Sequence, residues 1–107
     1  MNKYTGLSDF EINKKVAEKL GLAYEVTRYG VVTRMSNKEQ WREFNPCNNP
    51  ADAMPIIIEN KIGLSPMYHS NKWTADCLDY DFISVNKNPL RAAMELFLLI
   101  KDAENEG

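Results

Sequence analysis

Apolar side chains near the start of the chain lie four positions apart on one face of a helix: Ile12, Val16 and Leu20. Ser8 and Glu11 have the spacing of a capping box, in which the hydroxyl and the carboxylate each bond a free backbone N–H. Gly21 follows, and a glycine at this place supplies the left-handed end of a helix. The pattern predicts a first helix over residues 9–20.

After Gly21 the spacing changes to alternation. Three apolar positions alternate with small or polar ones: Leu22, Tyr24 and Val26. This is the period of a half-buried strand. Gly30 interrupts the run and two valines resume it, so residues 22–35 are predicted to form a β-hairpin that turns near Arg28 to Gly30. Residues 36–44 are read as a polar connection.

The dipeptide Asn-Pro stands before alanine-containing segments twice, at Asn49-Pro50 and Asn88-Pro89. Asparagine at an N-cap accepts from free amides, and proline at the first helical position has no N–H to leave unbonded. Each dipeptide is therefore interpreted as a helix start. An internal duplication is the alternative, but the flanking residues do not match.

The helix that begins at Pro50 is predicted to be irregular. Pro55 either kinks it or begins a new helix, because proline removes a backbone hydrogen bond. Residues 56–58 are three isoleucines, which we expect to be buried, and Gly63 is the expected stop. The runs IGLSPMYH and WTADCL follow and predict a second hairpin, with Pro66 at an edge or a bulge. A short strand is expected at residues 82–85.

The helix that begins at Pro89 is predicted to extend to about Lys101 and to form the core, because residues 96–100 are all apolar. Arg91 and Glu95 lie one turn apart and are interpreted as a solvated ion pair. An acidic tail from about residue 102 is expected to be frayed. The order α-ββ-α-ββ-α indicates an α+β fold in which helices pack against a small antiparallel sheet, as one domain over residues 1–107.

Composition and charge narrow the functional classes. The chain has 107 residues, 13 basic and 15 acidic, and a net charge of -2, so binding of duplex DNA is unlikely. Its longest apolar run is too short to cross a bilayer, and its start lacks the apolar stretch of a secretion signal. A cytoplasmic protein with reduced Cys47 and Cys77 is expected. A homo-oligomer is left open.

No constellation of residues indicates catalysis. The single histidine, His69, has no adjacent nucleophile, and one histidine with two isolated cysteines is poor material for a metal site. Motifs for phosphate loops, dinucleotides and hydrolases are absent from the sequence. We expect no enzyme activity, no cofactor and no metal.

The sequence offers more residues suited to binding than to catalysis. Arginine and aromatic side chains alternate near the first hairpin, and together they suit phosphates, nucleobases or protein surfaces. The asparagine-rich segment FNPCNNP adds amide edges. The candidate ligand- or partner-binding residues are Arg34, Trp41, Arg42, Phe44, Asn45, Asn48 and Trp73. The alternative is that the aromatic rings fill the core, the arginines solvate a sheet edge, and the asparagines form local turns.

The segments LSDFEINKKVAEKLG, FNPCNNPADAMPII and NPLRAAMELFLL, with Trp73-Thr74-Ala75 between the last two, resemble the NinX family of lambdoid phages over roughly residues 5–101. The chain is also similar to phage proteins described as α-β-α sandwiches. The resemblance implies a phage or prophage accessory protein in the bacterial cytoplasm, and it supplies no activity, cofactor or catalytic residue. Our first hypothesis is a non-catalytic counter-defence protein that sequesters a nucleotide-like molecule or blocks a host protein. The alternative is an accessory factor for phage DNA recombination or replication that binds single-stranded DNA or a protein partner.

Overall fold

Residues 2–106 are described by a computed structural model of the chain. Its helices are α1 (Asp9–Leu20), α2 (Pro50–Glu59) and α3 (Pro89–Glu106). Its strands are β1 (Ala23–Thr27), β2 (Gly30–Arg34), β3 (Arg42–Glu43), β4 (Gly63–Pro66), β5 (Trp73–Asp76) and β6 (Ser84–Asn86). The α+β class and the order of helices and hairpins are confirmed. The short strand β3, within the expected polar connection, is an addition to the predicted elements.

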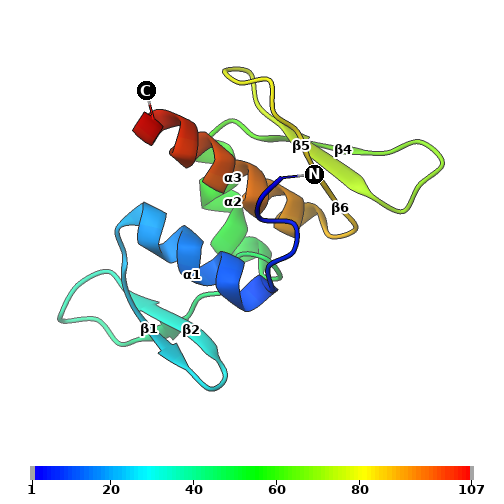
Figure 1. Cartoon of the computed structure of the whole chain (residues 1–107). Helices are drawn as coiled ribbons and strands as arrows, with labels where there is room; N and C mark the ends of the chain where they lie inside the picture. The colour runs from blue at the N-terminus through cyan, green and yellow to red at the C-terminus, as the bar shows by residue number, and fades with distance from the viewer. Residues whose placement is uncertain (1, 107) are drawn as a thin grey trace.

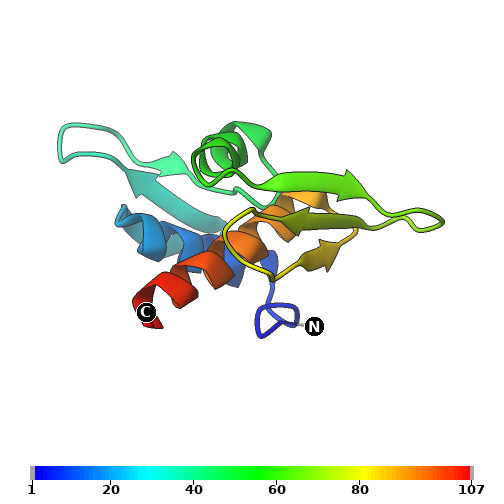
Figure 2. The same cartoon turned by 90° about the horizontal axis from the view of Figure 1, so that it is seen from above.

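The strands form two antiparallel three-stranded sheets, in the orders β1-β2-β3 and β4-β5-β6, where the sequence indicated one small sheet. Figure 1 shows the two sheets at opposite ends of a central group of helices, and the principal extents of the molecule are 45 × 32 × 23 Å. Helices α1 and α3 lie side by side, and α2 packs against α3 (Figure 2). The strands stay in separate sheets because the helices stand between the two hairpins.

Helix α1 has the bounds that the sequence predicts. The amide of Glu11 donates to the Ser8 hydroxyl at 3.1 Å, and the Glu11 carboxylate accepts from the amide of Ser8 at 3.1 Å. Gly21 closes the helix with φ at 72°, which a side chain would strain. The capping box and the glycine end are both confirmed.

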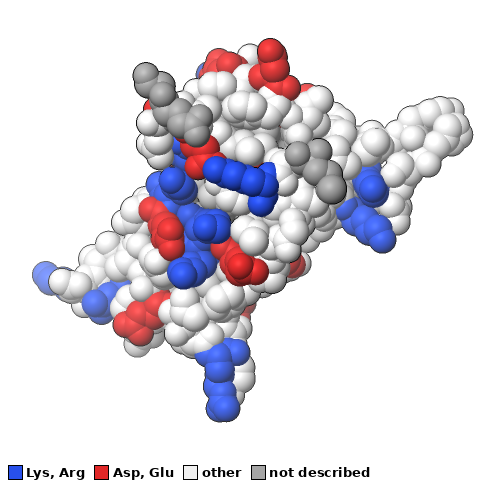
Figure 3. All heavy atoms as spheres, viewed as in Figure 1, with Lys and Arg blue, Asp and Glu red and all other residues white. Residues whose placement is uncertain are grey.

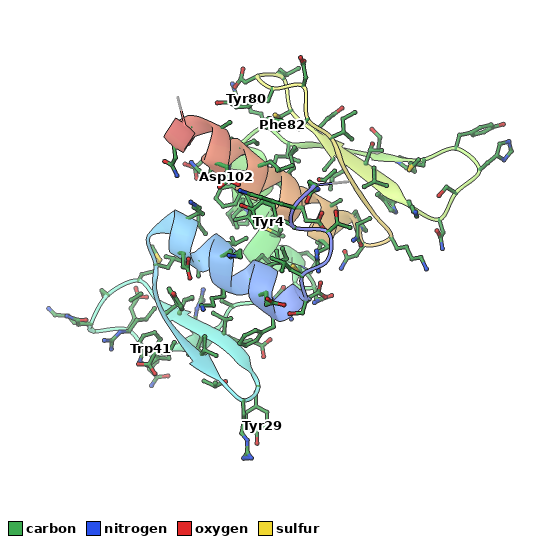
Figure 4. All side chains as sticks on the ribbon, viewed as in Figure 1. Tyr4, Tyr29, Trp41, Tyr80, Phe82 and Asp102 are labelled. Atoms are coloured by element: carbon green, nitrogen blue, oxygen red, sulfur yellow. The ribbon has the colours of Figure 1, made fainter. Side chains whose placement is uncertain are left out.

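Helix α3 forms the core of the molecule, as expected. Its fully buried apolar residues are Ala92, Ala93, Met94, Leu96, Phe97 and Leu98. The helix packs against α1, α2 and the second sheet. It continues beyond Lys101 to Glu106, so the tail that was expected to be frayed is helical over residues 102–106. Asp102 is held there by the Tyr4 hydroxyl, which donates to it, and by Lys3 at 3.0 Å (Figure 4).

The interpretation of Arg91 and Glu95 as a solvated pair is wrong. The pair exists, with Arg91 Nε 2.7 Å from Glu95 Oε2, but the side chain of Glu95 is fully buried. Arg91 also donates to Asp9 at 2.7 Å and to the backbone carbonyls of Tyr4 and Leu7 at 3.0 and 2.7 Å. The chain segment before α1 covers this side of α3, and spacing along one helix cannot reveal such a cover.

Helix α2 continues without interruption through Pro55. Two of the three isoleucines are buried as expected, namely Ile56 and Ile57. The expectation for Ile58 is wrong, since 68% of it is exposed, because successive helical residues point in directions about 100° apart. Gly63 does not stop the helix, which is capped by Asn60; it begins β4 instead.

Both predicted hairpins are present. The first turns at Arg28 and Tyr29, with Thr27 paired to Gly30, although Val26 is 50% exposed where burial was expected. In the second, Pro66 lies on the edge strand β4, where its missing N–H costs no ladder bond. The short strand expected at 82–85 is β6, which begins two residues later.

Both Asn-Pro dipeptides begin helices as predicted. Asn49 Oδ1 accepts from the amide of Ala51 at 3.0 Å, and Asn88 Oδ1 accepts from that of Leu90 at 2.9 Å. Asn49→Ala should lower the free energy of unfolding by about 1 kcal/mol. Asn88→Ala should cost more, because Asn88 Nδ2 also donates to the carbonyl of Cys47 at 2.6 Å.

Chemical denaturation of the two variants measures these losses, and Asn71→Ala in an exposed turn is the matched control. A loss at Asn88 no larger than that at Asn71 would contradict the assignment of its side chain as a cap.

Candidate functional site

Five of the seven predicted binding residues line two cavities at the first sheet. The first, called here the Arg34 groove, lies between the sheet, the end of α1 and α2, and has a volume of about 330 Å³. Its apolar lining residues are Leu20, Leu22, Met35, Phe44, Ala51, Pro55 and Ile56. Its polar lining residues are Thr33, Arg34, Glu39, Arg42, Asp52 and Glu59.

The second cavity, called here the Arg28 pocket, has a volume of about 240 Å³ and lies between the start of α1 and the turn of the first hairpin. It contains the predicted residues Asn45 and Asn48, together with Arg28 and Tyr29, which were not among the candidates. Phe44 is buried and lines both cavities, so it forms a wall between them.

Two predicted residues lie outside both cavities. Trp73 begins β5 in the second sheet, at the other end of the molecule from the first sheet, and takes no part in either cavity (Figure 1). Trp41 lies just before β3 and lines neither cavity, but it contacts Arg34 of the groove. The seven candidates therefore do not form one patch, and Arg34, Arg42 and Phe44 are the ones that the Arg34 groove brings together.

The contact between Arg34 and Trp41 follows from the pairing of β2 with β3. Thr33 lies opposite Arg42, so continuing the register by one residue places Arg34 opposite Trp41. The guanidinium carbon of Arg34 lies 4.5 Å from the centroid of a Trp41 ring. Figure 4 shows Trp41 on the first sheet, well apart from Tyr29 at the hairpin turn. Stacking of this kind holds an arginine in place and leaves the edge of its guanidinium group free to donate.

The donors of Arg34 are only partly used. One terminal nitrogen, Nη2, donates to Asn37 Oδ1 at 3.2 Å. Its Nε is buried and has no hydrogen-bond partner within residues 2–106. A buried donor without a partner costs free energy, so it marks a place where a bound acceptor would be favourable.

The arginines and the carboxylates of the Arg34 groove differ in how many partners they already have within the protein. Within the described residues no ion pair forms at Arg34 or Arg42, and the side chain of Arg42 is exposed. Two of the groove's carboxylates already accept backbone amides: Glu39 from Met35 at 3.2 Å, and Asp52 from Asn45 at 2.9 Å. The arginines thus keep more free hydrogen-bonding capacity than these two acids.

Pro55 removes one helical hydrogen bond beside the groove. It has no N–H, so the carbonyl of Ala51 cannot receive the helical bond from position 55. Both residues line the groove. The helix continues through this position, so the missing hydrogen bond beside the cavity is what remains of the predicted irregularity.

The asparagine-rich segment, residues 45–49 and called here the Asn loop, serves mainly to hold the fold together. Asn13 Nδ2 donates to Asn45 Oδ1 at 2.8 Å, and Asn13 Oδ1 accepts from the amide of Cys47 at 3.1 Å. Asn48 Nδ2 donates to Asp9 at 3.1 Å, and Asn48 Oδ1 accepts from Asn88 at 3.3 Å. Most of the amide edges that were candidates for a ligand already have partners inside the protein.

The described residues show little sign of reactive chemistry. No cluster of three or more histidine, cysteine or acidic side chains suited to a metal ion occurs among them. Cys47 is fully buried, and this burial raises the pKa of its thiol to about 12, so it stays protonated at neutral pH. The ring of His69 lies tilted against that of Tyr68 at an exposed turn. Within residues 2–106, no helix combines the length and the apolar character needed to cross a membrane.

Comparison with known sequences assigns the chain to a protein family. None of the curated proteins matches the chain. The family model described as "Bacteriophage P22, NinX" matches residues 3–101, which include all three helix starts, both sheets and the Asn loop. This range agrees closely with the extent of the resemblance drawn from the sequence segments. The chain therefore belongs to the phage NinX family.

Proposed function

We propose that this member of the NinX family is a non-catalytic phage accessory protein that acts in the host cytoplasm by holding a small, nucleotide-like ligand in the Arg34 groove. The observation that carries the proposal is the Arg34–Trp41 pair, which presents a fixed guanidinium group whose Nε is buried and unbonded within the described chain. Sequestering such a ligand would deprive the host of a signal, which is the counter-defence role.

The shape and lining of the groove suit a small molecule. Its volume of about 330 Å³ lies at the lower end of the range of ligand pockets, roughly 300–1,000 Å³. Its lining combines apolar side chains such as Leu22, Phe44 and Ile56 with polar and charged ones. Apolar side chains together with polar groups that fix the orientation of a ligand are usual in a ligand site.

The two arginines supply the preference for an anion. A guanidinium group can bind a phosphate through two parallel N–H donors, which lysine cannot do. Arg34 is already oriented by Trp41, so little side-chain entropy is lost when it binds. Arg42 is exposed and unpaired within residues 2–106, so it can move to a second phosphate oxygen. The carbonyl of Ala51 is a suitable acceptor for an amino group of a base.

Blocking of a host protein is the second candidate function for the same groove. Met35, one of its lining residues, is 74% exposed, and methionine is frequent at protein-binding surfaces. An apolar side chain of a host protein would occupy the groove in place of a base.

Fluorescence of Trp41 tests the proposal directly. The chain has two tryptophans, so Trp73→Phe leaves Trp41 as the single reporter beside the groove. Titration of this variant with AMP and ADP should change the emission saturably, while adenosine should bind more weakly because it lacks the phosphate. In that background Arg42→Ala should weaken binding at least about tenfold, since a hydrogen bond to a charged group contributes roughly 1.5–3 kcal/mol.

Arg28→Ala, in the other cavity, is the matched control and should leave binding unchanged. Thermal unfolding should show that Arg42→Ala costs less than about 0.5 kcal/mol, as for other exposed residues. If no nucleotide changes the emission of Trp41, sequestration of nucleotides through this groove is excluded and the host-protein candidate takes its place.

A further inference from the structure

The second hairpin and its neighbour β6 form a surface that the Arg34 groove does not use. The hairpin arm, defined as residues 63–76, projects from the body of the molecule (Figure 1). Helix α3 packs against one face of the second sheet, which buries Ala75 and Ser84 and partly buries Leu64. Side chains alternate along a strand, so the positions between them point to the opposite, outer face.

The outer face carries small and moderately apolar side chains. By this alternation Ser65, Thr74 and Val85 point to the outer face, and Val85 is 40% exposed. The register continues toward the tip, where the amide of Met67 donates to the carbonyl of Lys72 at 3.0 Å. Met67 therefore shares the face and is 38% exposed. The outer face therefore presents small and moderately apolar side chains to solvent.

Two lysines face each other at the end of this surface. Trp73 pairs with Asn86, and continuing the register by one residue places Lys72 opposite Lys87. Like charges directly opposite each other destabilise a pair of strands, unless an anion lies between them. Within the described residues neither lysine forms an ion pair.

Acidic side chains are absent from the arm except at its base, where Asp76 ends β5, although the whole chain has a net charge of -2. No Asp or Glu occurs in residues 63–75 or 84–94. In Figure 3 the arm that projects to the right carries blue spheres at its base and no red ones. The positive charge of this region is thus local and sits on the side of the molecule farthest from the first sheet.

The tip of the arm presents an aromatic ring to solvent. Tyr68 is 89% exposed and its ring centroid lies 4.0 Å from that of His69. His69 has φ at 59°, so the turn is held in a left-handed conformation that is uncommon for a histidine. The two ring planes are tilted by 51° and do not stack, and exposure of this extent leaves the Tyr68 ring open for stacking on a base.

We propose that the second hairpin arm binds a single strand of nucleic acid. The Lys72–Lys87 pair contacts successive phosphates, and the open ring of Tyr68 stacks on a base. A positively charged track combined with an aromatic ring is the arrangement by which proteins bind single strands without sequence preference. A base in a duplex is already stacked and cannot reach the ring, and two lysines are too few to hold a duplex alone.

Fluorescence anisotropy of the full chain with a labelled oligothymidylate of about eight nucleotides tests the proposal, since single-strand sites span roughly 4–16 nucleotides. Tyr68→Ala should weaken binding roughly 5- to 150-fold, the range equivalent to loss of one stacked base. Tyr29→Ala is the matched control, because this tyrosine stands at the turn of the other hairpin with 85% exposure. Its binding should equal that of the unaltered protein.

The salt dependence gives a second readout. Each phosphate contact on a single strand contributes roughly −0.7 to the slope of log K against log salt, so two contacts predict about −1.4. Lys72→Gln should reduce the slope to about −0.7, and Lys87→Gln should do the same. Arg34→Ala should change neither affinity nor slope, which separates this surface from the groove.

Several outcomes would overturn the inference. Equal losses for Tyr68→Ala and Tyr29→Ala would assign binding to exposed aromatic rings in general. Tighter binding of a duplex of the same length, or a slope near zero, would exclude the phosphate contacts. A polyglutamate peptide is the last competitor. If it displaces the oligonucleotide completely, and does so equally well in Tyr68→Ala, the arm is a docking surface for an acidic protein instead.

Discussion

Leu96→Ala should lower the free energy of unfolding by roughly 2–5 kcal/mol, and Phe97→Ala by about as much or more. Both side chains are fully buried on α3, where it contacts α1, α2 and the second sheet. Truncation removes apolar contacts and leaves a cavity that three surrounding elements cannot close without shifting relative to one another. The loss is measured from chemical-denaturation curves at constant slope.

Leu78→Ala is the matched control for this change. Leu78 is 91% exposed, so the same truncation should cost less than about 0.5 kcal/mol there. A loss below half a kcal/mol at both Leu96 and Phe97 would show that α3 is not the centre of the core.

Arg91→Ala should destabilise the protein by about 3–5 kcal/mol, which is the range for breaking a buried ion pair from one side. The Arg91 side chain is only 7% exposed and Glu95 is fully buried, so the variant leaves a carboxylate in the interior without its cation. Two backbone carbonyls, of Tyr4 and Leu7, lose their donor at the same time. Desolvation by itself lowers the pKa of Arg91, but the hydrogen bonds to Asp9 and Glu95 outweigh this effect. The pKa of Arg91 is therefore raised above its usual value, and the group stays charged.

The double variant Arg91→Met with Glu95→Met separates charge from packing. It removes both buried charges together, and Asp9, whose side chain is 45% exposed, can return to water. We expect it to regain much of the stability lost in Arg91→Met alone, because an uncompensated charge costs more than a missing pair. Arg28→Ala is the control for loss of an exposed arginine. A loss for Arg91→Ala no larger than that control would contradict the buried network.

Local signals in the sequence were sufficient for the three helix starts and for the end of α1. Ser8, Gly21, Asn49 and Asn88 act on backbone groups within four residues of themselves, so their roles can be inferred without knowing the tertiary structure. The hairpins follow from alternation for the same reason. Strand β3 has two residues, which is too short for any periodicity, and it forms because β2 offers a partner.

The misread pairings and the misplaced candidate residues depend on what lies across from a residue. Arg91 and Glu95 satisfy the spacing of a surface pair, and only the segment of residues 2–8, which folds back over α3, makes them interior. Likewise, Trp41 reaches Arg34 through the β2–β3 register, which the sequence does not display. Trp73 shares its residue type with Trp41 but belongs to the other sheet, so similar chemistry did not mean a shared site.

The Asn loop has a consequence for the helix dipoles. Asp9 at the start of α1, Asp52 in the first turn of α2 and the cap Asn88 of α3 all bond to residues 45–48. Three positive helix ends are thereby gathered at one place, where they repel one another. The carboxylates of Asp9 and Asp52 and the carbonyl of Cys47 offset this repulsion. A helix end that leaves breaks its bond to the Asn loop and loosens the loop that also holds the other two ends, so the parts of the chain that flank the loop should melt together rather than in turn.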